Sequence, residues 1–416
     1  MRFVVIGLHA AGRSACQWLR RLEPTAEIIG VDPQPEPPYS RPLISYVLAG
    51  EVPPDLLNIR ETDFFARHGV TLCRDKAVRL DPDRRLLVLS SGRELAYDAV
   101  LIATGSSPRP AGVSGPAAGD ILYFRDRDDL AKVQAALRPG GVAAVLGGGL
   151  VGFKLTCGLL AQGMRVRLMV ASPRPLSLNV DATAGSMVGG MLANRPGVNL
   201  YTGVSVRLME PGRERRYRLT LSDDTVHEVD LVAAGKGVIP ATTWLVGAGI
   251  DTNDGVPCDA YLETAAPGVF VAGDAALTND ISLNEPRLNA IWPMAVEQGR
   301  YAAINMAGRR VPYPGSLSQN AVPVFDSMMI SVGTVNPRYT DGCDFLTVSP
   351  SRKSYLNLVF RDDRLIGAVG LDAPPRLGEL ACAIRQGLRR GAIPETWLKN
   401  PAGAAPLATA GLASKR

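Results

Sequence analysis

The first stretch of the chain, residues 2–32, reads RFVVIGLHAAGRSACQWLRRLEPTAEIIGVD. The apolar run from Phe3 to Ile6 predicts a buried parallel strand, the segment 14–22 a helix, and the run 28–31 a second strand. Between them lies a glycine-containing turn, Gly7 to Gly12, and Asp32 follows twenty residues after Gly12. This order is typical of a βαβ unit that binds a dinucleotide.

Each part of this unit, here called the first cradle (residues 7–12 with Asp32), has a physical role. Gly7 permits a tight turn, Gly12 lets the helix pack on the sheet, and the helix N-terminus attracts a pyrophosphate. Asp32 is placed to accept hydrogen bonds from a ribose. His9 replaces the usual middle glycine, so its Cβ must stay clear of the phosphates. We expect cofactor contacts at Gly7, His9, Ala11, Gly12 and Asp32.

A second cradle (residues 147–152) repeats the pattern. The strand 142–146 precedes Gly147, Gly149, Leu150, Val151 and Gly152 in a complete G-x-G-x-x-G, and a helix to about 162 and a strand over 165–170 follow. Two such units predict two nucleotides bound by one chain. No acid follows the second strand, where residues 171–174 read ASPR. Ser172 and Arg174 are candidate contacts, and Arg174 either accommodates an NADP 2′-phosphate or is a solvated loop residue.

Composition excludes several classes of protein. The 416 residues are 46% hydrophobic and 20% charged, which fits two or three soluble domains. The 45 basic and 40 acidic residues are spread along the chain, so we expect no nucleic-acid partner. No apolar run predicts a membrane span or a signal peptide. The six cysteines are scattered without a C-x-x-C pair, which predicts buried free thiols, a cytoplasmic location and no metal or iron–sulfur cluster.

Further motifs stand at the ends of predicted strands. Residues 97–106 form a strand that runs into Ala103, Thr104 and Gly105, and residues 230–240 form another that enters a turn at Gly237. The strand 268–274 ends on Gly273 and Asp274. Residues 287–308 are predicted to be helical and contain Trp292. After about 311 we expect short strands, a helix near 378–390, and a loose tail in the last dozen residues.

In their order and spacing these motifs resemble the FAD-dependent pyridine nucleotide–disulfide oxidoreductase superfamily over nearly the whole chain. The resemblance implies an α/β fold with two Rossmann-like domains and a C-terminal α+β interface domain. It places FAD on residues 1–113 and 246–312, NAD(P) on 114–245, and the interface domain on 313–416. It also implies that Gly273 and Asp274 hold the ribityl-phosphate region of FAD.

The branch of the superfamily is indicated by the segment 39–46, YSRPLISY. Disulfide-reducing relatives carry a cysteine here, and this chain has none, so thiol exchange has no nucleophile. The segment, with Ser40, Arg41 and Pro42, resembles rubredoxin reductases and the flavin portion of assimilatory nitrite reductases. Trp292 resembles a tryptophan beside the flavin in ferredoxin-reductase relatives. The flavoprotein subunit of phenylglyoxylate dehydrogenase is also similar.

Two positions depart from these relatives, which often have lysine at Tyr46 and glutamate at Lys154, forming an ion pair near the flavin. We expect Lys154 and Tyr46 to lie at the reaction site, with Lys154 supplying positive charge near flavin N5. The alternative is a Lys154 side chain that points to solvent.

The resemblance therefore implies an FAD enzyme that exchanges a hydride with NAD(H), favoured over NADP(H), and passes electrons to or from an iron–sulfur protein or subunit. It would act as a homodimer or within a hetero-oligomeric complex. One alternative is an NAD(P)H oxidase or disulfide or peroxide reductase. A second is a non-catalytic flavin-binding structural subunit.

Overall fold

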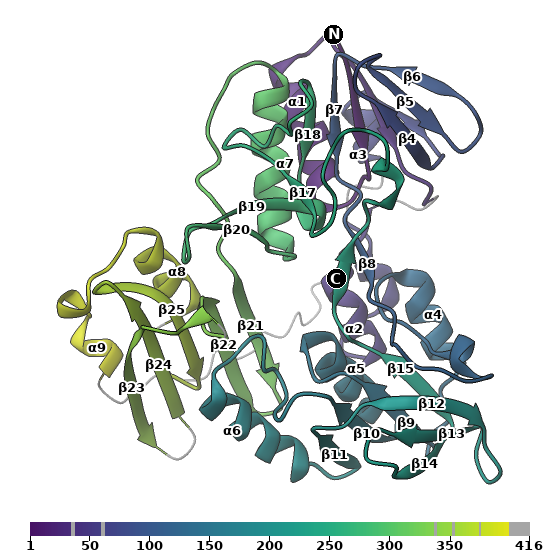
Figure 1. Ribbon diagram of the computed structural model, residues 1–416, viewed down its shortest axis with the longest axis vertical. Coiled ribbons are helices and arrows are strands. Elements are labelled where there is room, and N and C mark those ends of the chain that lie inside the picture. The colour runs from purple at the N-terminus through teal and green to yellow at the C-terminus, as the bar shows by residue number, and fades with distance from the viewer. Residues whose placement is uncertain (35–37, 60–62, 337–338, 352–353, 374–375, 399–416) are drawn as a thin grey trace, which may run out of the picture. The chain divides into compact units, whose positions relative to one another are not determined.

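The computed structural model describes residues 1–34, 38–59, 63–336, 339–351, 354–373 and 376–398 (Figure 1). The chain divides into two compact units, residues 1–318 and 319–416. Both cradles lie in the first unit. The predicted tail lies outside the described residues.

The first cradle is built on a parallel sheet of five strands. In spatial order they are β18 (Val269–Val271), β7 (Ala99–Ile102), β1 (Arg2–Ile6), β2 (Glu27–Val31) and β3 (Val70–Cys73). Successive side chains of β1 point to opposite faces, and both faces are covered because every residue from Phe3 to Ile6 is buried. Phe3 and Val5 pack in the cluster that includes α1 (Ala10–Leu22) and α7 (Trp292–Met306), which lie side by side (Figure 1).

The opposite face of this sheet receives Val4 and Ile6, which pack with residues of a small antiparallel sheet. Its strands are β4 (Ala77–Asp81), β5 (Leu86–Leu89) and β6 (Glu94–Ala96). Two short helices, α2 (Ile44–Leu48) and α3 (Phe64–Arg67), lie in the segment between β2 and β3.

The second cradle is built on a four-stranded parallel sheet. Its strands in spatial order are β11 (Val198–Thr202), β10 (Arg165–Val170), β9 (Val142–Leu146) and β15 (Leu231–Ala234). The helices of this region are α4 (Arg127–Ala135), α5 (Leu150–Ala161) and α6 (Ala182–Ala193). Apolar residues of β9 and β15 also pack with an antiparallel sheet of β12 (Val206–Pro211), β13 (Tyr217–Leu221) and β14 (Val226–Val229).

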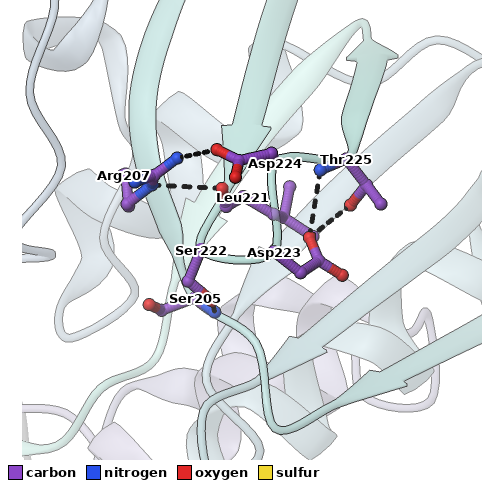
Figure 2. Close-up of polar contacts among 7 residues, drawn as sticks. All are labelled: Ser205, Arg207, Leu221, Ser222, Asp223, Asp224 and Thr225. Carbon is purple, nitrogen blue, oxygen red and sulfur yellow. Dashed lines mark hydrogen bonds and ion pairs between the residues drawn. The ribbon is translucent and has the colours of Figure 1, made fainter.

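The hairpin that joins β13 to β14 is closed by an exposed polar turn (Figure 2). Asp224 adopts a left-handed conformation with φ of +65° and forms an ion pair with Arg207 of β12. Asp223 accepts hydrogen bonds from the backbone and hydroxyl of Thr225 at 3.1 and 2.6 Å. These contacts stabilise the turn of the hairpin. The charged residues of this turn therefore have a structural role within the hairpin.

Two strands connect the two parallel sheets. The pair β8 (Ser106–Pro108) and β16 (Val238–Pro240) is antiparallel, and β16 begins directly after Gly237, whose φ is +86°. A second small sheet contains β17 (Val256–Pro257), β19 (Ala276–Asp280) and β20 (Glu285–Leu288).

The second unit contains one antiparallel sheet. Its strands in order are β21 (Gln319–Val324), β22 (Ser327–Gly333), β25 (Arg364–Leu371), β24 (Ser354–Arg361) and β23 (Asp344–Ser351). Helix α8 (Leu377–Arg385) contacts this sheet, and α9 (Glu395–Leu398) follows. The sequence prediction of an α/β fold with a C-terminal α+β domain is confirmed, while the boundaries at 113, 245 and 312 stay predictions.

Several helix boundaries differ from those predicted. Helix α1 begins at Ala10 rather than at residue 14. The helix predicted from 287 is wrong at its start, since β20 extends to Leu288 and α7 begins at Trp292 with a proline in its first turn. The helix predicted to 390 ends at Arg385, because Gly387 takes a left-handed φ of +65°. Among the described helices, none is both long and apolar enough to cross a bilayer.

Candidate functional site

The glycines of the first cradle are required by the backbone of the protein itself. Gly7 has a φ of +89°, and a Cβ there would lie 2.2 Å from the Ala103 carbonyl oxygen. A Cβ on Gly12 would lie 1.8 Å from the carbonyl oxygen of Gly7. Any larger residue would push α1 away from β1. The turn therefore brings the N-terminus of α1 to the carboxyl end of the sheet, where an anion binds favourably.

Asp32 ties this turn to the end of β2. Its Oδ2 accepts a hydrogen bond from the Leu8 N–H at 2.7 Å, and its Oδ1 accepts one from the Gln34 N–H at 2.9 Å. A carboxylate oxygen can accept a second bond, so the arrangement fits a ribose hydroxyl as a further donor. The predicted ribose contact stays a prediction.

His9 is the N-terminal cap residue of α1. Its Nε2 lies 2.5 Å from Oε1 of Gln34, and its ring meets the Tyr39 ring edge-on at 5.1 Å. Burial, and next the guanidinium of Arg41, lower the pKa of His9 to about 4. The imidazole is therefore neutral at pH 7.

Ser40, Arg41 and Pro42 lie at a short 3-10 helix, residues 41–43, that Ser40 caps and Pro42 starts. The Ser40 N–H donates to the Leu57 carbonyl at 2.9 Å. Arg41 is half-buried, and its Nε has no hydrogen-bond partner among the residues that the structure describes. An unpaired guanidinium nitrogen in a nucleotide cradle suits a phosphate oxygen.

Asp274 is held by an arginine that sequence reasoning missed. Arg125 donates to Asp274 Oδ2 at 2.6 Å and to the Ser106 hydroxyl at 2.8 Å, and that hydroxyl also donates to Asp274 at 2.8 Å. The Arg125 and Asp274 side chains are 24% and 14% exposed. Arg125 precedes α4 far from any glycine motif, so a single sequence gave no signal for it.

The neighbouring Gly273 is fixed by the first turns of α7. Its N–H donates to Oε1 of Gln298 at 2.7 Å, and the Gln298 amide in turn reaches the Ser316 hydroxyl at 3.0 Å. A Cβ on Gly299 would lie 2.1 Å from the Ala11 carbonyl oxygen, so α1 and α7 approach through this glycine and Ala11. Trp292, the first residue of α7, is half-buried.

The predicted motif 103–105 follows β7 and is bonded to β1 and to Ala241, the residue after β16. Ala103 donates its N–H to Ile6 at 2.8 Å, and the Thr104 hydroxyl donates to the Ala241 carbonyl at 2.9 Å. Gly105 and Gly237 both take positive φ and have nothing within 4 Å of a Cβ position. They lie at the start of the paired strands β8 and β16, where backbone is open to a ligand.

The second cradle has the same backbone as the first. A Cβ on Gly152 would lie 1.8 Å from the Gly147 carbonyl oxygen, and one on Gly147 would lie 2.6 Å from that of Gly235. Gly149 caps α5, with nothing within 4 Å of a Cβ position, and Leu150 and Val151 begin the helix. The helix N-terminus is therefore open for a pyrophosphate.

The strand register shows which residue of the second cradle corresponds to Asp32 of the first. Ile6 pairs with Val31, and Leu146 pairs with Met169, so Val170 stands where Asp32 stands in the first cradle. Val170 is buried, and its methyl groups lie 2.7 Å from the Cβ position of Gly148.

The residues proposed from the segment 171–174 lie in the loop after β10. The Ser172 hydroxyl donates to the Arg174 carbonyl at 2.7 Å, and the aliphatic part of Arg174 lies 3.5 Å from the Cβ position of Gly185 on α6. Their predicted nucleotide contacts stay predictions.

Lys154 and Tyr46 meet where α2 packs against α5. The Lys154 Nζ lies 3.9 Å from the centre of the Tyr46 ring, a cation–π contact. The helices are fixed by a hydrogen bond from the Gln162 amide to the Leu48 carbonyl at 2.9 Å. Lys154 therefore does not extend freely into solvent. Its predicted place beside a flavin stays a prediction.

The six cysteines are free thiols, of which two are buried, three half-buried and Cys382 exposed, so the prediction of uniform burial was wrong. Burial raises the pKa of Cys16 and Cys258 to about 12 and that of Cys157 to about 11. These three thiols are protonated at neutral pH and are poor nucleophiles. Within the described residues, no group of three or more His, Cys, Asp or Glu side chains could hold a metal ion.

Two proteins of known name are similar to this chain in sequence over most of its length. The NADH-dependent phenylglyoxylate dehydrogenase subunit epsilon of Aromatoleum evansii is 29% identical over 376 residues, 89% of this chain and 88% of the relative. The ferredoxin–NAD(+) reductase component of the p-cumate 2,3-dioxygenase system of Pseudomonas putida is 30% identical over 321 residues, 75% of this chain and 76% of the relative.

Among solved structures, the ferredoxin reductase for the CYP199A2 system from Rhodopseudomonas palustris matches with a TM-score of 0.80 and 25% identity, over 89% of this chain and 91% of that one. The family model for pyridine nucleotide-disulphide oxidoreductases matches residues 1–299. The chain thus belongs to the pyridine nucleotide-disulphide oxidoreductase family, whose members bind FAD and a nicotinamide nucleotide and are oxidoreductases.

Proposed function

We propose that this protein transfers electrons between NAD(H) and an iron–sulfur protein or subunit through FAD. The observation that carries the proposal is the pair of cradles at the ends of two parallel sheets, with no thiol between Cys16 and Cys73. Segment 39–46 holds Ser40, Arg41 and Tyr46 where disulfide-reducing relatives carry a cysteine. The enzyme therefore lacks the group that would attack a disulfide.

FAD would bind at the first cradle. The N-terminus of α1 and the guanidinium of Arg41 would hold its diphosphate, and Asp32 its adenosine ribose. Asp274, oriented by Arg125 and Ser106, would accept hydrogen bonds from the ribityl chain. When bound, FAD accepts the two electrons of a hydride and releases electrons one at a time.

Lys154 and Tyr46 would adjust the reduction potential of the bound flavin. The Tyr46 ring holds the ammonium group of Lys154 at a fixed place between the two domains. A fixed positive charge beside the flavin favours its more negative, reduced form. This role needs no proton transfer by Lys154, only a constant charge.

The nucleotide at the second cradle would be NAD(H). Two relatives are named as NADH-dependent or NAD(+)-linked enzymes. Gly149 leaves room for the pyrophosphate, while buried Val170 offers neither a ribose acceptor nor a cation for a 2′-phosphate. The loop with Ser172 and Arg174 would lie near the adenosine.

The electron partner would be a separate protein. One relative is named as a ferredoxin–NAD(+) reductase component and another as a dehydrogenase subunit, which supports an iron–sulfur protein or subunit as partner. We further propose a cytoplasmic location and assembly as a homodimer or within a hetero-oligomeric complex.

An acceptor panel tests this proposal. The purified flavoprotein, supplied with NADH, is offered a ferredoxin, a rubredoxin, oxidised glutathione and hydrogen peroxide in separate anaerobic assays. We expect rapid reduction of an iron–sulfur protein and no turnover with the disulfide or the peroxide. Turnover with the disulfide or peroxide alone would replace the proposal with a reductase function.

A further inference from the structure

His9 distinguishes the two cradles. Gly149 leaves the middle position of the second cradle open, while His9 fills the same position in the first. Its imidazole contacts Gln34 and makes a T-shaped contact with the Tyr39 ring. The side chain is thus held at the N-terminus of α1 rather than free in solvent.

The hydrogen bond to Gln34 sets which imidazole nitrogen carries the proton. The amide oxygen of Gln34 accepts, so Nε2 of His9 is the donor and Nδ1 is left with a lone pair. That Nδ1 is buried and has no hydrogen-bond partner among the described residues. A buried ring nitrogen without a partner can bind a proton and donate it in a hydrogen bond when an acceptor is placed beside it.

Charged groups from several of the described elements act on this imidazole. Arg41, from the 3-10 helix, and Arg125, before α4, disfavour a proton on it, while Asp32 of β2 favours one. The Tyr39 ring that packs on His9 is itself covered by the guanidinium of Arg127 at 4.5 Å. The dipole of α1 adds further positive potential at its N-terminus. Burial, and next the guanidinium groups of Arg41 and Arg125, therefore keep His9 neutral.

We propose that His9 couples cofactor binding to proton uptake: when the diphosphate of FAD enters the first cradle, Nδ1 takes a proton from solvent and donates it to a phosphate oxygen. This rests on the proposed binding of FAD at that cradle. The diphosphate brings two negative charges to the place where Arg41, Arg125 and the helix dipole meet. Those charges oppose the effect of burial and of the nearby cations on His9 and stabilise the imidazolium.

The sign of the pH dependence follows from this coupling. The pKa of His9 is about 4 without the ligand, and the bound diphosphate raises it. Between these two values the complex holds one proton more than the free protein. The affinity for FAD therefore rises as the pH falls through this range, by up to about tenfold per pH unit.

Calorimetry of FAD binding to the apoprotein measures this proton directly. Titrations at about pH 6, in two buffers of different ionisation enthalpy, are expected to show uptake of up to one proton by the wild type. His9→Gln and His9→Gly should bind FAD with no uptake. His68→Gln is the matched control, because His68 bonds to the Phe64 carbonyl at 2.8 Å and stacks on the Phe64 ring at 4.2 Å outside the cradle. It should keep the wild-type uptake.

A measurement on the holoprotein keeps the proposal testable where apoprotein does not refold. The phosphorus NMR signals of bound FAD should shift between about pH 5 and pH 8 in the wild type and in His68→Gln, and stay constant in His9→Gln. Signals that are constant in the wild type, or that shift equally in His9→Gln, would overturn the role of His9. Failure of the wild type to bind FAD would instead overturn the proposed function.

Discussion

The first cradle and the second cradle have the same backbone conformation at their glycines but differ in their side chains. In each, the first and last glycines sit where a Cβ would collide with the protein's own carbonyl oxygens, 1.8 Å away at Gly12 and at Gly152. The middle position and the residue after the second strand differ, with His9 and Asp32 in the first and Gly149 and Val170 in the second. Positions that pack against backbone are thus fixed by the fold, and the two cradles differ at positions where we propose that their two nucleotides bind.

The strongest test of this comparison exchanges glycines for alanine. Gly12→Ala and Gly152→Ala should each cost about 3 kcal/mol of stability or more, the upper end for overpacked sites. Gly149→Ala should cost only about 0.5 kcal/mol, for a poorer helix cap, but weaken NAD(H) binding because its methyl group faces the open cradle. Thermal unfolding and nucleotide titration separate these effects.

Gly190→Ala is the matched control for these glycines. Gly190 lies in α6 with nothing within 4 Å of its Cβ position, so alanine there should stabilise slightly. Equal losses at Gly12, Gly149 and Gly152 would mean that the glycines do not differ in the way the structure requires.

Arg125 forms an ion pair with Asp274, the residue after Gly273. Arg125→Met should leave Asp274 without its cation and lower FAD affinity by about 10- to 100-fold, less than for a fully buried pair because both groups are partly exposed. Arg215→Met is the control, since Arg215 pairs with Asp230 of the other domain at similar burial. It should reduce stability and leave FAD affinity unchanged, as measured by flavin fluorescence. Equal FAD affinity in both variants would contradict a cofactor-holding role for Arg125.

Val170→Asp gives the second cradle the acid of the first. A carboxylate there should accept a ribose hydroxyl and repel a 2′-phosphate, which should raise the ratio of kcat/KM for NADH over NADPH by about tenfold. Val170→Asn keeps the shape without the charge and should change this ratio less. If aspartate and asparagine act alike, Val170 does not occupy the position that corresponds to Asp32.

Lys154→Gln should change the flavin itself. Removing the fixed charge should lower the two-electron potential of the bound flavin by roughly 30 mV, equivalent to about 1.4 kcal/mol. Lys154→Arg should preserve the potential, and Lys132→Gln, at an exposed position of α4, serves as the control. Redox titration against reference dyes gives the values, and a potential in Lys154→Gln equal to that of the wild type would remove Lys154 from the flavin site.

Much of the fold could be predicted from the sequence because buried parallel strands are apolar runs and their turns need glycine. The two βαβ units were located correctly for this reason, and short strands lie after residue 311 as expected, although β21 and β23 were not predicted individually. Helix starts were less predictable, as at Trp292, because the preceding strand β20 depends on its partner β19.

The site was predicted only where its residues belong to motifs. Arg125 is 149 residues from its partner Asp274, and no local pattern connects them. The place of Val170 required the register of β9 and β10. The contact between Lys154 and Tyr46 depends on the packing of α2 on α5, which two distant helical segments do not reveal in sequence.

The proposed hydride transfer from NADH to FAD is tested most directly by anaerobic stopped-flow mixing of the purified flavoprotein with NADH and, separately, with NADPH. We predict that NADH rapidly bleaches the visible absorption band of the oxidised flavin and that NADPH does so much more slowly. An unchanged flavin spectrum with both nucleotides would contradict the proposed function and leave a flavin-binding structural subunit.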